Sequence, residues 1–415
     1  MKVILYTLNF KPELTGVGKY SGEMAAWLAS RGHEVRVVAA PPYYPEWIVG
    51  RDYSARAYRR EFIDGVSVLR CPLWVPRKPS GLKRLIHLAI FALSSLPVML
   101  RQVFWRPDVV WVVAPAFFCA PGAWLTARLC GAGAWLHVQD FEVDAAFDLG
   151  LLKGNLLRRA VMLLERWMFR RFDVVSTISQ RMLERVRSKG VESSRALLFP
   201  NWVDISSVRP EMRCAAYSAE LGIAPDTVMA LYSGNMGGKQ GLEILAQVAV
   251  LLQGDARLVF VFCGNGAGRA DLMAQCADLS NVRFLDLQPL EKLGTLLASA
   301  DIHLLPQRAD AADLVMPSKL TGMLASGRPV VATAHQGTEV ARVIEGCGIA
   351  VPPEDPLAFA RAIGDLVGNF EMRESLGRAA RLYAEDYLAR DAVLGAFESA
   401  LLDLSETGAL GAPGG

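Results

Sequence analysis

Residues 3–40 read VILYTLNFKPELTGVGKYSGEMAAWLASRGHEVRVVAA, and the pattern in this stretch decides the fold. A short apolar run, VILYTL, is followed by a loop with Gly16 and Gly18, by an amphipathic stretch near residues 20–31, and by a second apolar run, HEVRVVAA. The order strand, helix, strand predicts two parallel strands joined by a right-handed crossover helix.

The same alternation runs through the first half of the chain and begins again in the second half. Further strands are expected at 66–71, 108–114, 134–139 and 173–179, then at 227–235, 256–264, 281–286, 301–307 and 328–334. Helices are expected near 121–130 and from about 242. This pattern predicts an α/β protein with two doubly wound Rossmann-like domains. Ligands of such sheets bind at the carboxyl ends of the strands, so we expect the domains to face each other across a cleft.

The best domain boundary is the turn-rich stretch LLFPNWVDISSVRP at 197–210, where the charge balance also changes. Residues 1–200 carry 28 Lys and Arg against 16 Asp and Glu, and residues 201–415 carry 16 against 26. We therefore expect one domain at 1–200 and a second at 201–385. A C-terminal helix at 386–404 is expected to pack back towards the first domain, and 405–415 to be a disordered tail.

Composition points to a cytoplasmic globular protein. The chain has 415 residues, of which 52% are hydrophobic, and its seven cysteines form no CxxC pair. Buried free thiols in a reducing compartment are the expected state. The first ten residues, MKVILYTLNF, fit a strand better than a signal peptide. The basic first half could meet nucleic acid, anionic lipid or a phosphorylated substrate, and its sign alone does not choose among them.

Gly16 and Gly18 match the start of a dinucleotide-binding fingerprint, but the rest of that fingerprint is missing. Ser21 stands at the third glycine position, and no acidic residue lies near 39–40 to hold a ribose. The two glycines suit a long loop whose backbone N–H groups approach a phosphate. The alternative is a plain flexible turn.

The second half contains two lysines at expected helix starts that follow strands. Lys239 lies in YSGNMGGKQGLE (232–243), and Lys319 lies in DLVMPSKLTGMLASGRPVVAT (313–333). Loop N–H groups, helix dipoles and ammonium groups would converge there on an anion. We interpret the pair as a diphosphate site, although each lysine taken alone is more often a solvated surface residue.

Read together, several segments make the chain similar to a known family. TGVGKY, HVQDFE, FPNWVD, VFCGNGAGR and PSKLTGMLASGRPVV, in this order, resemble glycosyltransferase family 4, whose fold is GT-B, over almost the whole chain. NFKPELTGVGKY, APPYYPEW and DFEVDAAFDLG look closest to colanic-acid and O-antigen cluster transferases. The resemblance implies retaining transfer of a sugar from a nucleotide diphosphate without a metal or other cofactor. The sequence contains no D-x-D pair, which agrees with that.

The resemblance assigns donor contacts to three segments. The donor-binding positions it implies are Gly16, Gly18, Gly234, Asn235, Gly241, Ser318 and Leu320. Asn235 replaces the arginine of many relatives, so Lys239 and Lys319 must carry the cationic role. The E-x7-E pattern is broken, with Gly322 at its second glutamate, Leu314 at its first and Asp313 beside it, which leaves the ribose contact open.

The first domain holds two further candidates. Relatives have His-Asp after one strand, where this chain has Gln139 and Asp140, with His137 two residues earlier. The resemblance implies that Asp140 contacts an acceptor hydroxyl or the donor sugar. His137 is either a catalytic group or a core histidine with satisfied hydrogen bonds.

Two basic stretches suggest contact with a membrane surface. The apolar run Leu85–Leu100 has basic groups at both ends but falls short of the roughly twenty residues of a spanning helix. It fits a helix in the membrane interface or one that simply covers the sheet. The stretch 154–173 predicts a second basic amphipathic helix, for which sheet packing is the stronger alternative.

Together these inferences predict a retaining, metal-independent hexosyltransferase that moves a sugar from a nucleotide diphosphate sugar to a lipid-linked saccharide in exopolysaccharide or O-antigen assembly. The first domain would bind the acceptor and the membrane, and the second the donor. The expected partners are the two substrates and the anionic inner face of the cytoplasmic membrane, to which the protein would bind peripherally, with no nucleic acid. The alternatives are a sugar-nucleotide 2-epimerase of the same fold and a non-enzymatic sugar-nucleotide-binding scaffold.

Overall fold

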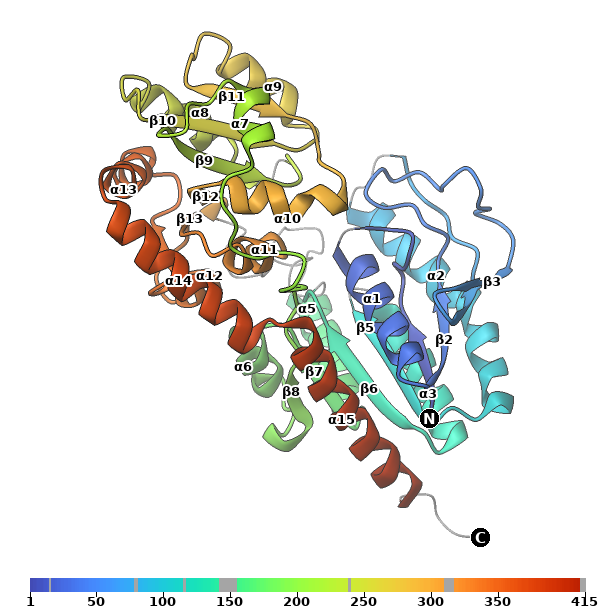
Figure 1. Cartoon of the computed structure of the whole chain (residues 1–415). Coiled ribbons are helices and arrows are strands. Elements are labelled where there is room, and N and C mark those ends of the chain that lie inside the picture. The colour runs from blue at the N-terminus through green and yellow to red at the C-terminus, as the bar shows by residue number, and fades with distance from the viewer. Residues whose placement is uncertain are drawn as a thin grey trace. The chain divides into compact units, whose positions relative to one another are not determined.

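The computed structural model describes residues 1–14, 16–77, 81–114, 117–141, 155–237, 240–309 and 317–410, without the side chains of 155–158, 215 and 407–410. The chain divides into two compact units (Figure 1). Unit 1 comprises Met1–Pro200 and Leu394–Gly415, and unit 2 comprises Asn201–Val393.

Unit 1 is built on an eight-stranded sheet in the order β3-β4-β2-β1-β5-β6-β7-β8. Its strands are β1 (Lys2–Tyr6), β2 (Glu34–Ala39), β3 (Arg59–Ile63), β4 (Val66–Arg70), β5 (Val109–Ala114), β6 (Gly133–Val138), β7 (Val174–Thr177) and β8 (Ala196–Leu198). All neighbours pair in parallel except β3 and β4, which are antiparallel. Every residue of β5 and β6 is buried, as their continuous apolar runs require in a sheet covered on both faces.

Helices follow the strands of unit 1. They are α1 (Gly16–Ser30), α2 (Gly81–Arg101), α3 (Ala120–Cys130), α5 (Asn155–Phe169) and α6 (Gln180–Ser188). The start of α6 is capped by Ser179, whose side chain accepts a hydrogen bond from the Met182 N–H, and α3 ends at Gly131 in the left-handed conformation. The bounds of α3 are close to the helix expected near 121–130.

Helix α2 (Gly81–Arg101) is longer than the apolar run Leu85–Leu100 from which a helix was expected. One face is buried through His87, Leu88, Phe91, Ser95 and Met99. In the part of the chain that the structure describes, Gly81–Trp105 is the one segment that is long and apolar enough to cross a membrane, with a mean hydropathy of 1.5. Only 28% of that apolar window is buried in the protein, and Leu82, Ile86 and Leu93 are exposed.

Unit 2 contains a six-stranded parallel sheet in the order β11-β10-β9-β12-β13-β14. Its strands are β9 (Val228–Ser233), β10 (Leu258–Cys263), β11 (Val282–Leu285), β12 (Ile302–Leu305), β13 (Val330–Thr333) and β14 (Gly348–Val351). Its helices are α7 (Ala215–Leu221), α8 (Glu243–Leu251), α9 (Arg269–Gln275), α10 (Leu290–Ser299), α11 (Lys319–Ala325), α12 (Glu339–Ile344), α13 (Pro356–Gly368) and α14 (Phe370–Tyr387). Two apolar cores line this sheet. The two parallel-sheet units confirm the predicted α/β class of two Rossmann-like domains.

The last helix, α15 (Arg390–Leu410), begins in unit 2 and belongs to unit 1 from Leu394 onwards. Within unit 1, the ring of Phe397 stacks on Phe199 at 4.5 Å between centroids and meets the edge of Trp135 at 5.1 Å. The helix runs to Leu410, past residue 405, where we expected a disordered tail to begin. Phe397 therefore joins an aromatic cluster with Trp111, Trp135 and Phe199 from the first 200 residues.

Candidate active site

In unit 2, the Lys319 side chain lies beside the glycine loop that follows β9. Its Nζ atom donates hydrogen bonds to the Tyr232 hydroxyl at 3.1 Å and to Gln240 Oε1 at 2.9 Å, and lies 4.4 Å from the Tyr232 ring centroid. A Cβ added to Gly234 would lie 3.7 Å from this Nζ. Burial lowers the pKa of Lys319 to about 7. Lys319 is thus a cation whose charge responds to its surroundings.

Glycines allow the loops around Lys319 to touch backbone to backbone. Gly234 has φ +139°, and a Cβ on Gly264 (φ +147°) would lie 1.9 Å from the Gly234 carbonyl oxygen. A Cβ on Gly266 (φ +149°) would lie 2.6 Å from the Met236 carbonyl oxygen. Gly234 was predicted as a site residue, whereas Gly264 and Gly266 were not, although the repeated glycines in CGNGAGR are the signal that could have found them.

The other predicted residues of this loop differ in their exposure and contacts. Asn235 is exposed, and its carbonyl oxygen accepts a 2.6 Å hydrogen bond from the Tyr232 hydroxyl. Gly241 has φ +62° and approaches the backbone at Gln307 and Arg308. Lys239 lies outside the described residues, so its predicted role stays a prediction.

At the start of α11, the three predicted phosphate contacts separate into different environments. Ser318 is exposed, and Lys319 turns towards Tyr232. Leu320 is fully buried, and its N–H already donates to the Pro317 carbonyl oxygen at 3.0 Å. A Cβ on Gly322 would lie 3.0 Å from Leu297 Cδ1, so this position packs against α10. Asp313 and Leu314 lie outside the described residues.

In unit 1, Gly16 and Gly18 meet different structural requirements. Gly16 opens α1 with φ +57° and has open space where a Cβ would stand. A Cβ on Gly18 would lie 2.8 Å from the Cβ of Glu13. The buried Glu13 carboxylate accepts hydrogen bonds from the N–H groups of Tyr43 at 2.8 Å and Tyr44 at 2.9 Å. Sequence motifs did not indicate Glu13, because the two N–H groups at Tyr43 and Tyr44 lie 30 and 31 residues away in the chain.

His137 lies in the core of unit 1. Its Nδ1 is 2.8 Å from the Ser176 hydroxyl, its Nε2 is 3.0 Å from the Gln139 amide nitrogen, and its ring stacks on Trp111 at 5.2 Å. Burial lowers the pKa of His137 to about 3, so the ring is neutral. These contacts match a core histidine with satisfied hydrogen bonds.

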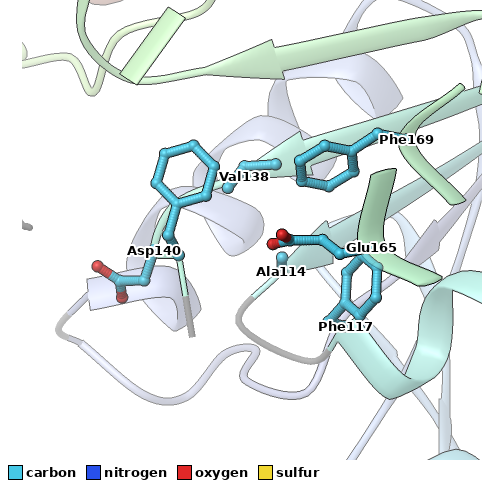
Figure 2. Close-up of a pocket in the computed structure, with 7 residues that line it drawn as sticks. Ala114, Phe117, Val138, Asp140, Glu165 and Phe169 are labelled. Atoms are coloured by element: carbon cyan, nitrogen blue, oxygen red, sulfur yellow. The ribbon is translucent and has the colours of Figure 1, made fainter. Parts of the chain in front are cut away.

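Asp140 follows β6 beside a small cavity of about 10 Å³ (Figure 2). The cavity is lined by Ala114, Phe117, Val138, Asp140, Phe141, Glu165 and Phe169. In Figure 2 the Asp140 carboxylate points away from that of Glu165. Glu165 forms a buried ion pair with Lys189, whose Nζ lies 5.3 Å from the Phe141 ring centroid. Phe141 is thus anchored in the core, and it fixes where the neighbouring Asp140 leaves the strand.

Within the described ranges, no group of three or more His, Cys, Asp or Glu side chains is placed to hold a metal ion. The polar groups gathered at Lys319 suit an anion, because they place an ammonium beside a loop residue, Gly234, that has no side chain.

Comparison with known proteins identifies the class of protein that this fold and site define. Residues 15–202 match the family model "Glycosyl transferase 4-like domain", and residues 227–369 match "Glycosyl transferases group 1". The chain belongs to glycosyltransferase family 4 and is a glycosyltransferase of the GT-B fold. Over 407 residues it is 43% identical to WcaI of Escherichia coli (strain K12), a glycosyl transferase assigned to colanic acid biosynthesis, covering 96% of this chain and 98% of WcaI.

Solved structures share the fold at low sequence identity. Sucrose-phosphate synthase from Thermosynechococcus elongatus has a TM-score of 0.75 at 15% identity, covering 98% of this chain and 99% of that one. HepE of Anabaena, in complex with UDP-glucose, has a TM-score of 0.68 at 14% identity, covering 97% and 100%. The family resemblance that the sequence motifs indicated is confirmed.

Proposed function

We propose that this glycosyltransferase moves a hexosyl group from a nucleotide diphosphate sugar to a lipid-linked saccharide during assembly of an exopolysaccharide of the colanic-acid kind, with retention and without a metal. The similarity to WcaI supports the pathway, since WcaI is assigned to colanic acid biosynthesis. The UDP-glucose complex of HepE supports a sugar nucleotide as the donor.

The observation that carries this proposal is the position of Lys319 beside Gly234. Transfer breaks the bond between the anomeric carbon and a diphosphate oxygen, and the departing diphosphate needs a positive partner. The Lys319 ammonium is held by Tyr232 and Gln240, next to a loop with no side chain in the way. An anion bound there favours the protonated lysine and so raises its pKa above 7.

Retention needs no strong base on the protein. A leaving phosphate oxygen can accept the proton of the acceptor hydroxyl while the new bond forms on the face that the diphosphate leaves. Asp140 would orient that hydroxyl, and its carboxylate would also favour the positive charge that develops at the sugar ring. A neutral, buried His137 has no part in this sequence of steps.

The surface of α2 supports peripheral binding at the inner face of the cytoplasmic membrane. Leu82 and Leu93 are each 70% exposed, and Lys83, Arg84 and Arg101 are exposed on the same helix. Each basic group near an anionic membrane surface contributes about 1 kcal/mol, and salt weakens the attraction. A membrane-bound enzyme would meet a lipid-linked acceptor directly.

The test combines a thermal-shift panel of UDP-, GDP- and dTDP-sugars with a transfer assay on lipid-linked saccharides. We expect one donor to stabilise the protein, turnover only when an acceptor is present, an unchanged anomeric configuration in the product, and activity in EDTA. Complete loss of activity in EDTA that Mg²⁺ reverses would contradict the metal-independent route. A changed sugar nucleotide formed without acceptor would indicate an epimerase, and binding without any turnover would indicate a scaffold.

A further inference from the structure

Unit 1 contains a groove of about 840 Å³ that the donor and Asp140 sites do not use. It lies between residues 46–49, the segment 72–77 that follows β4, and Ile90 on α2. Ligand pockets in proteins measure about 300–1,000 Å³, so the groove is large enough for a substantial part of a ligand.

The walls of the groove are mostly apolar and are open to solvent. Trp47, Ile48, Val49, Trp74, Val75 and Ile90 contribute to its lining. Ile48 is 68% exposed and Trp74 is 42% exposed. Large apolar side chains gathered in a concave, exposed surface are typical of a ligand-binding site rather than of ordinary surface.

A buried histidine holds two walls of the groove together. His87 Nδ1 donates to the Trp74 carbonyl oxygen at 2.7 Å, and its Nε2 accepts a hydrogen bond from the Tyr43 hydroxyl at 3.0 Å. The His87 ring also lies 5.4 Å from the ring of Trp47. Because burial lowers the pKa of His87, the ring stays neutral and keeps this arrangement. The groove is therefore fixed before any ligand arrives.

The charged groups at the groove favour an anion. Among the described residues of its lining, Arg56 and Arg77 are basic and Glu46 is acidic, and the Arg84 guanidinium lies 5.8 Å from the Trp47 ring centroid. Sugar hydroxyls require several hydrogen-bonding groups, whereas most of this lining is hydrocarbon. An apolar chain that ends in a phosphate satisfies both features, because arginine binds phosphate and the hydrocarbon walls exclude water.

The segment that leads into residues 46–49 of the groove also carries Tyr44. Burial raises the pKa of the Tyr44 hydroxyl, and the charges of Arg84, Asp140 and Glu13 also act on it. These groups come from the segments that follow β1, β2 and β6 and from the start of α2.

We propose that this groove binds the apolar chain of the lipid-linked acceptor next to its phosphate, with Arg56 and Arg77 contacting the phosphate and Trp47, Trp74 and Val75 enclosing the chain. The inference rests on the proposed function, because it assumes a lipid-linked acceptor. It adds a specific site that recognises the lipid, separate from the open apolar face of α2 on the membrane.

The binding test uses decyl phosphate below its micelle concentration, so that no membrane surface takes part, and follows tryptophan fluorescence. We expect saturable binding that weakens about tenfold or more in Val75→Glu and in the double variant Arg56→Gln/Arg77→Gln. Phe62→Glu and Arg51→Gln, at exposed positions outside the groove lining, serve as matched controls and should bind as the wild type does. Equal affinity in groove and control variants would overturn the proposal.

Three further ligands identify what the groove recognises. Decyl maltoside carries a chain without phosphate, inorganic phosphate is a head group without a chain, and dihexanoylphosphatidylglycerol represents a bilayer lipid. We expect each to bind more weakly than decyl phosphate. Tighter binding of the maltoside would indicate a saccharide site, and tighter binding of the phosphatidylglycerol would indicate a bilayer-lipid site, and either result contradicts the proposal.

The transfer assay separates failure of this inference from failure of the proposed function. If the wild type transfers sugar to a lipid-linked acceptor, Val75→Glu should raise KM for that acceptor with kcat and donor KM nearly unchanged. An unchanged acceptor KM would overturn the groove alone. Absence of transfer by the wild type to any lipid-linked acceptor would overturn the proposed function.

Discussion

The ring of Tyr232 forms one wall around the ammonium of Lys319, and the two residues, 87 positions apart in the chain, are joined by both a hydrogen bond and a cation–π contact. The Tyr232 hydroxyl accepts from Lys319 and donates to the Asn235 carbonyl oxygen, so its own position is fixed from the other side. Burial favours the neutral form of such an amine and brings its pKa to about 7, whereas a bound anion favours the charged form.

Affinity for a nucleotide sugar should depend on the protonation state of Lys319. Lys319 is protonated below pH 7 in the free enzyme, and donor binding raises its pKa. Affinity should therefore be highest below pH 7 and fall by up to about tenfold per pH unit above it, until the pH passes the pKa of the complex. Calorimetric titrations at pH 6, 7.5 and 9 measure this slope, and the diphosphate of a nucleotide sugar does not itself titrate in that range.

Lys319→Arg is the matched control for the pH experiment. Arginine stays charged throughout the range, so the slope should vanish even if the longer side chain weakens binding. Lys319→Ala should lose both affinity and turnover. A slope that persists in Lys319→Arg would assign the titration to another group.

Gly264→Ala should disrupt the donor loop. Its Cβ would lie 1.9 Å from the Gly234 carbonyl oxygen, and φ +147° is unfavourable for alanine, so the loop must move. We expect donor affinity to fall at least about tenfold, with a lower melting temperature. Gly254→Ala, which meets nothing within 4 Å, is the control and should behave as the wild type. Normal donor binding by Gly264→Ala would show that this loop does not contact the donor.

Neutralising Lys83, Arg84 and Arg101 should weaken binding to anionic vesicles. Three groups at about 1 kcal/mol each predict a loss of two orders of magnitude at low salt and a smaller loss at high salt. Vesicle flotation measures this, with a triple variant at Lys292, Arg361 and Arg378 of unit 2 as the charge-matched control. If the wild type and the variant neutralised on α2 bind neutral and anionic vesicles equally at every salt concentration, the electrostatic attraction is contradicted and only apolar contacts would explain membrane binding.

Phe397→Ala should destabilise unit 1 by about 3–5 kcal/mol, because it removes a ring that is 3% exposed and leaves a cavity beside Phe199 and Trp135. Leu402→Ala, on the same helix but 43% exposed, should cost under about 1 kcal/mol. Urea unfolding followed by tryptophan fluorescence compares them. Similar losses for both would mean that α15 does not complete the core.

Strands that are buried on both faces could be predicted from the sequence, because burial requires an unbroken apolar run, as in β5 and β6. β3 could not, since RREFI lies at the sheet edge with none of its residues buried and shows no apolar run. β14 was missed for a similar reason, as its sequence GIAV is short and only Val351 is buried. Edge strands depend on the neighbour that they pair with rather than on their own pattern.

In the candidate site, too, features encoded by a few neighbouring residues could be predicted and contacts between distant residues could not. Local motifs identified the glycine loop and Lys319, because backbone freedom and charge can be recognised within a few residues. Tyr232, Gln240 and Glu13 were not identified, since each acts through contacts with residues distant in sequence, such as the 79 positions between Gln240 and Lys319. The choice between a catalytic and a core role for His137 required its contacts with Trp111 and Ser176.

The place of Phe397 in unit 1 also sets an order of events during synthesis. Residues 1–200 leave the ribosome first, but the aromatic faces of Trp135 and Phe199 stay uncovered until residue 397 follows. At about 5–20 residues per second this interval lasts roughly 10–40 s. Unit 2, which spans Asn201–Val393, can finish folding within that time. The first unit to be made is thus the last to be completed, and its nascent form is the one that needs protection from aggregation.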